Sequence, residues 1–380
     1  MPVAAGTALV LGGGIMGLSA ARALAAQGWR TTVLDQDPIP NPRGSSHDQH
    51  RLIRHAYGAE LGYMAMVDQA FAAWDRLWAD LGTSHYVPTG VLAMAEAPGG
   101  WLGASRAALR GAGHAVEDIA PDSLPARLPM LAATGLTDAF LTIPGGVLLA
   151  DRILAGLLRL CTTQGIRFRQ ARVTAVDPEH ARATLADGTT LAADLLVVTA
   201  GPWLPRLLPA QPVRASRQVI VMLEPPAALR SAWEAAPMML DLADDGGFYA
   251  VPPVAGATLK LGDHRFAPSG DAEEPRAASP AEAEEILALA RRRLPGLDRY
   301  RLLEARACHY DVSPEERFLL APLGARGWVM GGFSGHGFKF GPLLGEALAS
   351  AVANPALATL LPAWAAGLAP PPPGLLPSGA

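Results

Sequence analysis

The most restrictive feature of the sequence is the segment 8–35, in which two apolar runs flank a glycine cluster. Apolar residues 8–11 lead into Gly12-Gly13-Gly14-Ile15-Met16-Gly17, and an alanine-rich stretch follows to residue 27. A second apolar, β-branched run at 31–34 ends at Asp35. This order predicts a strand, a tight turn, a helix and a second strand that carries a carboxylate at its end.

The spacing of the glycines indicates what such a turn binds. Gly12 permits the tight turn, Gly14 lets the backbone approach a pyrophosphate, and Gly17 lets the helix pack closely on the strand. The helix N-terminus offers N–H groups to the phosphates, and Asp35 lies where an acid accepts from a ribose hydroxyl. The motif therefore predicts a dinucleotide site, and it fits NAD, NADP and FAD equally.

Composition limits the partners and the compartment. The net charge of −4 provides no basic surface for nucleic acid or acidic lipid. Two cysteines, Cys161 and Cys308, exclude a disulfide framework and suit a reducing compartment. The apolar N-terminus lacks the basic region of a signal peptide, and no stretch has the length of a charge-free membrane helix. We therefore expect a cytoplasmic protein that binds neither nucleic acid nor membrane.

The order of strand and helix patterns predicts two domains of α/β class. Strands and helices alternate near both ends of the chain, whereas the region 205–300 is rich in hairpin patterns. We expect a Rossmann-like cofactor-binding domain built from the discontinuous segments 1–85, 145–210 and 302–365. An α+β substrate domain with an antiparallel sheet is expected from 86–144 and 211–301, followed by a Pro-rich tail at 366–380.

Four further clusters concentrate reactive side chains at 45–57, 260–264, 308–310 and 331–341. Their histidines lack the spacing of a metal ligand set, so we expect no metal site. The isolated His114 and His180 are expected to be surface residues. No nucleophile elbow of a serine hydrolase is present. The dense glycines of the last cluster indicate backbone packed against a flat ligand.

These clusters contain four specific blocks. They are Arg51-Leu52-Ile53-Arg54-His55-Ala56-Tyr57-Gly58, Leu259-Lys260-Leu261-Gly262-Asp263-His264, Cys308 with Tyr310, and Phe333-Ser334-Gly335-His336-Gly337-Phe338-Lys339-Phe340. In this order they resemble the monomeric sarcosine oxidase and N-methyltryptophan oxidase family of FAD-dependent amine oxidases, within the D-amino-acid-oxidase-like superfamily. The resemblance extends from the glycine motif to about residue 353, and it implies FAD as the cofactor and a monomer.

The resemblance also implies roles for individual residues. Cys308 would carry the flavin as an 8α-S-cysteinyl thioether. Lys260 would lie above the flavin ring and favour reaction with O₂, because a fixed cation stabilises the negative charge that develops. Arg54 and Lys339 would clamp a substrate carboxylate, for which a guanidinium fork is suited. His264, Tyr310 and Tyr249 would line the substrate side.

The implied cofactor contacts extend along most of the chain. In addition to Gly12, Gly14, Gly17, Asp35 and Cys308, they comprise Ile15, Met16, Gln36, Ser46, His47, Arg51, Val173, Ala200, Gly201, Trp203, Gly335, His336, Gly337 and Lys339.

The implied activity is that of a flavoprotein oxidase. It would oxidise the C–N bond of a secondary (N-methyl) amino acid such as sarcosine to an imine and reduce O₂ to H₂O₂. The alternatives are an oxidase of a cyclic imino acid or fructosyl amino acid, a related dehydrogenase, and a non-catalytic flavin-binding sensor, which needs no carboxylate clamp. The sequence departs from the family pattern at Asp48-Gln49-His50, His309, Asp311 and Phe248. These positions flank the flavin and the pocket, so the amine substrate stays open.

Overall fold

Two large β-sheets organise the computed structural model, which describes residues 6–242, 247–267 and 269–377. The six-stranded sheet has the order β19-β20-β13-β1-β2-β9. Its strands are β1 (Gly6–Leu11), β2 (Trp29–Asp35), β9 (Arg167–Gln170), β13 (Leu195–Val198), β19 (Leu319–Leu323) and β20 (Gly327–Gly331). All neighbours are parallel except β19 and β20, so this sheet unites distant segments of the chain.

Both faces of this sheet are covered, which explains its nearly continuous apolar strands. Ala8 and Val10 of β1 face the helices, whereas Leu9 and Leu11 face a small three-stranded sheet. The covering helices are α1 (Ile15–Ala26), α2 (Leu61–Leu81), α5 (Ala150–Thr163) and α9 (Gly341–Ala353). The small sheet consists of β10 (Val173–Asp177), β11 (Arg182–Leu185) and β12 (Thr190–Ala192).

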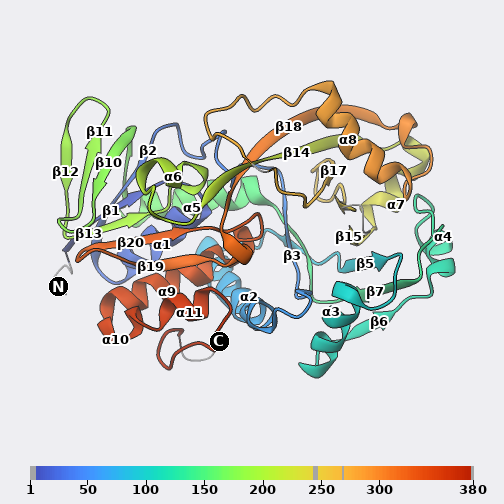
Figure 1. The fold of residues 1–380 in the computed structure, drawn as a ribbon, viewed down its shortest axis with the longest axis horizontal. Coiled ribbons are helices and arrows are strands. Elements are labelled where there is room, and N and C mark those ends of the chain that lie inside the picture. Colours follow the sequence, from blue (N-terminus) through green and yellow to red (C-terminus); the bar gives the residue numbers. More distant parts are fainter. Residues whose placement is uncertain (1–5, 243–246, 268, 378–380) are drawn as a thin grey trace.

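The eight-stranded sheet has the order β18-β14-β17-β16-β15-β5-β7-β6. Its strands are β5 (Val91–Ala95), β6 (Val116–Asp118), β7 (Asp138–Thr142), β14 (Arg214–Glu224), β15 (Met238–Asp241), β16 (Phe248–Val251), β17 (Leu259–Gly262) and β18 (Arg301–Val312). A second hydrophobic core joins it to α8 (Pro280–Arg291), which begins with a capping box between Ser279 and Glu282. Figure 1 shows the two sheets in opposite halves of the molecule.

Shorter elements connect these layers. Strands β3 (Arg51–Ile53), β4 (Tyr86–Val87) and β8 (Gly146–Leu148) form a third small sheet. The remaining α-helices are α3 (Gly100–Gly111), α4 (Leu124–Arg127), α6 (Leu204–Leu207), α7 (Arg230–Glu234), α10 (Pro355–Ala358) and α11 (Leu361–Ala365). Single 3₁₀ turns are η1 (Pro121–Ser123), η2 (Gly201–Trp203), η3 (Ala227–Leu229), η4 (Leu297–Arg299), η5 (Pro314–Glu316) and η6 (Phe338–Phe340). Within the described residues, no helix is both long and apolar enough to span a membrane.

The architecture confirms the expected α/β class and the discontinuous first sheet, with two corrections. The segment 302–312 was expected in the cofactor domain, but β18 pairs along its whole length with β14 in the second sheet. The second sheet is also not wholly antiparallel, because β15 and β5 run parallel. The exact domain boundaries stay a prediction. Leu375 of the Pro-rich tail is buried in the first core, and residues 1–5 and 378–380 lie outside the described residues.

Candidate active site

The glycine motif forms the base of a cavity at the carboxyl ends of β1 and β2, where α1 begins. A Cβ atom on Gly17 would lie 1.8 Å from the carbonyl oxygen of Gly12, and one on Gly12 would lie 2.4 Å from that of Thr199. Only glycine fits at these two positions. The Asp35 carboxylate accepts from the Gly13 N–H at 2.8 Å and from the Asn41 amide at 2.8 Å, which fixes the turn.

Most of the expected cofactor residues line this cavity, whose volume is about 510 Å³. Those that line it are Gly12, Gly14, Ile15, Met16, Asp35, Gln36, Ser46, Arg51, Val173, Ala200, Gly201, Trp203, Gly335 and Gly337. Gly17 and His47 do not line it. Gly17 lies behind the turn against Gly12, and the partly exposed His47 has its pKa lowered by burial.

A second cavity of about 510 Å³ continues from the first. Arg51, Tyr310, Gly335 and Phe338 line both cavities. The second sheet contributes one wall through Tyr249 on β16, Lys260 on β17, and Cys308 and Tyr310 on β18. The opposite wall contains Arg54, which follows β3, and His336 and Lys339 around η6. The structure thus brings the expected catalytic residues to a single cavity.

Lys260 is buried and paired. Its side chain is 3% exposed, and its Nζ lies 2.7 Å from Oδ2 of Asp48 and donates to the carbonyl of His50 at 2.7 Å. Burial lowers the pKa of Lys260 to about 8, although Asp48 opposes the shift. Asp48 also contacts Arg51 and lies 3.3 Å from Arg306. These cations hold the pKa of Asp48 far below its usual range despite its burial.

Lys339 is buried and Arg54 is partly buried, and neither cation has such a partner. Within the described residues, neither forms an ion pair with a carboxylate, although the charge of Glu316 acts on Arg54 and opposes the lowering of its pKa. Nη1 of Arg54 is buried and has no hydrogen-bond partner. The Arg54 guanidinium lies over the rings of Tyr57 at 4.6 Å and Trp101 at 5.4 Å. Lys339 Nζ donates to the Tyr57 hydroxyl at 2.8 Å and to the carbonyl of His336 at 2.8 Å. Burial lowers the pKa of both Arg54 and Lys339.

The alternation of β18 explains which of its side chains reach the cavity. Cys308 and Tyr310 line it, whereas His309 between them points away and lies 3.3 Å from Glu274. Burial raises the pKa of the Cys308 thiol, and the nearby Arg51 guanidinium opposes that rise. His264 is at the rim: its side chain is 50% exposed and lies 3.5 Å from Glu316.

The sequence interpretation missed several residues of this region. Asp48 appeared only as a departure from the family pattern, without a role. Tyr57 and Trp101 line the second cavity, and Asp311 lines the first. Burial raises the pKa of Asp311 to about 6, and its Oδ2 has no hydrogen-bond partner. Only Tyr57 could have been predicted as a cavity residue, from its position in the block 51–58. Trp101 and Asp48 reach the cavity through tertiary packing, which the sequence pattern does not indicate.

Comparison with known proteins identifies the fold. Residues 7–351 match the family model described as FAD dependent oxidoreductase. The chain belongs to this family. N-methyl-L-tryptophan oxidases of Yersinia pestis and Yersinia pseudotuberculosis are 29% identical to it over 350 residues, which cover 90% of this chain and 93% of theirs.

Solved structures of an amadoriase and of a fructosyl peptide oxidase share the fold. Amadoriase I from Aspergillus fumigatus superposes with a TM-score of 0.77 at 19% identity, covering 93% of this chain and 87% of its own. A modified fructosyl peptide oxidase from Aspergillus nidulans superposes with a TM-score of 0.78 at 20% identity, covering 92% and 91%. At these identities the likeness concerns the fold alone.

The first cavity fits the cofactor of the FAD-dependent oxidoreductases. The glycine turn has no room for side chains at Gly12 and Gly17, which leaves backbone exposed to a pyrophosphate. Gly14, Ile15 and Met16 at the start of α1 line the same cavity. These residues and Asp35 would hold the adenosine and pyrophosphate. The residues that line both cavities would hold the flavin ring between the two sheets.

Proposed function

We propose that this FAD-dependent oxidoreductase oxidises the C–N bond of an N-methyl or other secondary amino acid. The observation that carries the proposal is a pair of cations, the partly buried Arg54 and the buried Lys339, which form no ion pair with a carboxylate of the described residues yet line the cavity that continues from the cofactor groove. Burial of an unpaired charge costs several kcal/mol, of the order of 3–5. A substrate carboxylate offsets this cost by completing the charge balance.

The geometry around the two cations supports one orientation of such a substrate. Arg54 offers a guanidinium fork whose Nη1 is unpaired, and Lys339 adds a point charge held by Tyr57. With the carboxylate at these groups, the amine and the carbon next to it extend toward Tyr310 and Phe338, which line both cavities. FAD, when bound there, supplies the acceptor for the hydride equivalent that leaves this carbon.

Room for a side chain favours an N-methyl amino acid larger than sarcosine. The second cavity has a volume of about 510 Å³ and aromatic walls that include Tyr57, Trp101 and Tyr249. Such walls suit an apolar or aromatic substituent. The relatives named N-methyl-L-tryptophan oxidase support this class. Sarcosine is then the smallest member of the substrate class.

The proposal includes a covalent flavin and O₂ as the electron acceptor. Cys308 lines the second cavity beside Arg51, where a thioether to the flavin ring would form. Lys260, which lines the same cavity, would provide a cation near this ring, where reduction of O₂ to H₂O₂ develops negative charge. The imine product would be hydrolysed; for sarcosine this yields glycine and formaldehyde.

A dehydrogenase is the second candidate, and Asp48 favours it. Its carboxylate, 2.7 Å from Lys260 Nζ, compensates the charge that would promote the reaction with O₂. In that case the flavin would be reduced by the same substrates, but a carrier would replace O₂.

An oxygen electrode and anaerobic flavin bleaching test the proposal together, with a panel of N-methyl, cyclic and fructosyl amino acids. We expect N-methyl amino acids to bleach the flavin and to consume O₂. Bleaching without O₂ uptake would support the dehydrogenase. Absence of bleaching by every N-substituted amino acid, at full flavin content, would refute the proposal.

The covalent link has its own test. After acid precipitation, wild-type protein should retain the yellow colour in the pellet, and Cys308→Ala should release it into the supernatant. Cys161→Ala is the matched control, because Cys161 is equally buried but lies on α5. Release of all flavin from the wild-type protein would exclude the link.

A further inference from the structure

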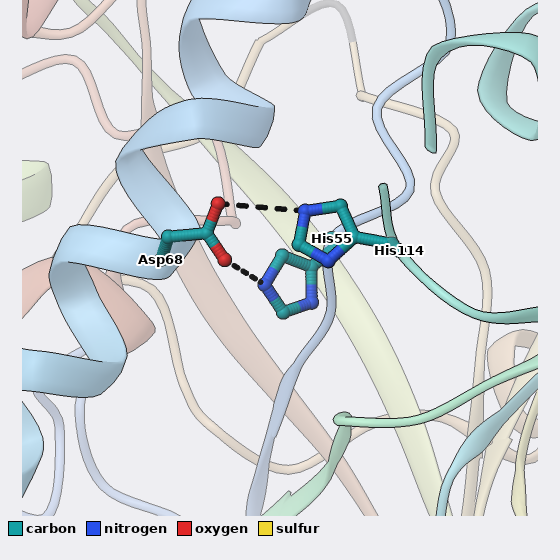
Figure 2. Close-up of side chains that lie close together, drawn as sticks. All are labelled: His55, Asp68 and His114. Atoms are coloured by element: carbon teal, nitrogen blue, oxygen red, sulfur yellow. Dashed lines mark hydrogen bonds and ion pairs between the residues drawn. The ribbon is translucent and has the colours of Figure 1, made fainter. Parts of the chain in front are cut away.

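A cluster of two histidines and an aspartate lies outside the cavities described above (Figure 2). Asp68 comes from α2, His55 from the segment after β3, and His114 from the segment after α3. One Asp68 oxygen lies 2.9 Å from Nε2 of His55, and the other lies 3.4 Å from Nε2 of His114. Within residues 6–242, 247–267 and 269–377, no other group of three such side chains comes as close together.

The hydrogen bonds of His55 leave a ligand-like nitrogen facing Asp68. Its Nδ1 lies 3.2 Å from the carbonyl oxygen of Pro144, which only accepts, so Nδ1 carries a hydrogen. In the neutral ring, Nε2 then presents a lone pair to the Asp68 carboxylate at 2.9 Å. Two acceptors face each other stably only if a proton or a metal cation lies between them. A histidine that ligates a metal typically has this arrangement, with its other nitrogen donating to a backbone carbonyl.

The separations of the ligand atoms also suit a metal ion. Tetrahedral zinc, with bonds of about 2.0–2.2 Å, holds its ligand atoms roughly 3.3 Å apart. The two nitrogens lie 2.9 and 3.4 Å from different oxygens of Asp68, close to that value, and one ligand atom from each residue can be chosen so that all three lie within 4.8 Å of one another. The Asp68 side chain is 55% exposed, whereas His55 is 2% exposed. The site therefore has one side open to solvent, where water completes the coordination.

We propose that His55, Asp68 and His114 bind a divalent transition-metal ion of the zinc class. Two imidazoles and one carboxylate form a ligand set that such ions prefer. The ion would join three segments that are 13 and 46 residues apart in sequence, which is why no spacing motif indicated it. The metal ion would take the place of the proton that otherwise lies between Nε2 of His55 and the Asp68 carboxylate. The proposal differs from the sequence expectation that no metal binds and that His114 is a surface residue.

The chain provides a matched control. His180 and Asp177 form an exposed pair with Nδ1 and Oδ2 also 2.9 Å apart, but no third ligand joins them in the described structure. Their side chains are 66% and 44% exposed. This pair tests whether a histidine–aspartate contact alone is enough to bind the metal.

The experiment is equilibrium dialysis of the full-length, flavin-loaded protein against Zn²⁺ after chelator treatment, with any histidine tag removed. We expect one zinc ion per chain in wild type and in His180→Ala. Asp68→Asn and His114→Ala should each lower the affinity by at least about 100-fold, since loss of even an outer-shell partner costs 10–100-fold. Asp68→Asn keeps the volume of the side chain and should fold, so it tests the site even if His114→Ala, which removes a ring 4.5 Å from that of His55, loosens the packing.

A thermal readout complements the binding measurement. Zinc should raise the Tm of wild type and of His180→Ala, because it binds only the folded arrangement of the three segments. It should leave the Tm of Asp68→Asn unchanged. Equal zinc affinity in wild type and in both ligand variants, or no zinc bound by wild type, would overturn the proposal.

Discussion

The second cavity is lined by two groups of cations, and only one of the two groups is paired with a carboxylate of the described residues. Lys260 lies 2.7 Å from Asp48, which also contacts Arg51, so the protein itself balances this charge. Arg54 and Lys339 instead contact hydroxyl, carbonyl and aromatic groups, and within the described structure Glu316 acts on Arg54 without forming an ion pair. A charge removed from water destabilises the protein unless a counter-ion lies beside it. Lys260 therefore has its counter-ion before substrate binds, whereas Arg54 and Lys339 would obtain theirs from the substrate.

Removal of Arg54 tests the unpaired group and should have the largest effect. We expect Arg54→Met to lower kcat/KM for the substrate by at least about 100-fold, since a desolvated charge contact contributes of the order of 2–5 kcal/mol. Arg54→Lys should retain part of the activity, because it keeps the charge but loses the fork. Steady-state kinetics measures both.

The same variant should not be less stable than wild type. Arg54 is partly buried, has a buried Nη1 without a hydrogen-bond partner and forms no ion pair within the described residues, so its replacement removes a cost to folding. Thermal unfolding of ligand-free protein measures this directly. A large drop in Tm would mean that Arg54 supports the fold and would remove the argument from its unpaired charge.

Removal of Asp48 tests the paired group through its pH dependence. Lys260 has a pKa lowered by burial to about 8, so its charge is lost as the pH rises through that value. Reoxidation of the reduced enzyme by O₂ should therefore slow above pH about 8. In Asp48→Asn the favourable charge is gone, and the decline should begin at least about one pH unit lower. Stopped-flow mixing of reduced enzyme with O₂ measures the profile, and an unchanged midpoint would contradict the assignment.

Ligand-induced stabilisation compares the two groups without catalysis. A short carboxylic acid without an amine, such as propionate, should raise the Tm by about 5 °C at 100-fold over its Kd. Propionamide, which has the same shape without the charge, should have no comparable effect. In Arg54→Met the difference between the two compounds should disappear, whereas in Asp48→Asn it should persist.

The rim residue should show the smallest effect. His264 is half exposed and lies 3.5 Å from Glu316, so its contacts are screened by solvent. We expect His264→Ala to change kcat/KM by less than about threefold, in keeping with the 0–1 kcal/mol of exposed pairs. A loss of kcat/KM as large as that in Arg54→Met would show that His264 binds the substrate carboxylate together with Arg54 and Lys339.

Local patterns predicted the glycine turn and the first parallel strands, which follow from short-range chemistry. Lys260, Arg54 and Lys339 were instead assigned from the resemblance of contiguous blocks to a known family. The role of Asp48 required a contact with Lys260 across 212 residues. Likewise, β18 joins the second sheet through a register with β14 that no local propensity encodes. Charge pairing and sheet membership depend on tertiary structure, so these parts were missed.

The most direct test of the central claim is anaerobic flavin reduction by an N-methyl amino acid and by its methylamide, in wild type and in Arg54→Met. The two compounds differ at the carboxylate and share the C–N bond that is oxidised. Wild type should reduce its flavin at least about 100-fold more efficiently with the acid, and Arg54→Met should lose most of this preference. The same preference in both proteins would contradict the assignment of Arg54 to the substrate carboxylate.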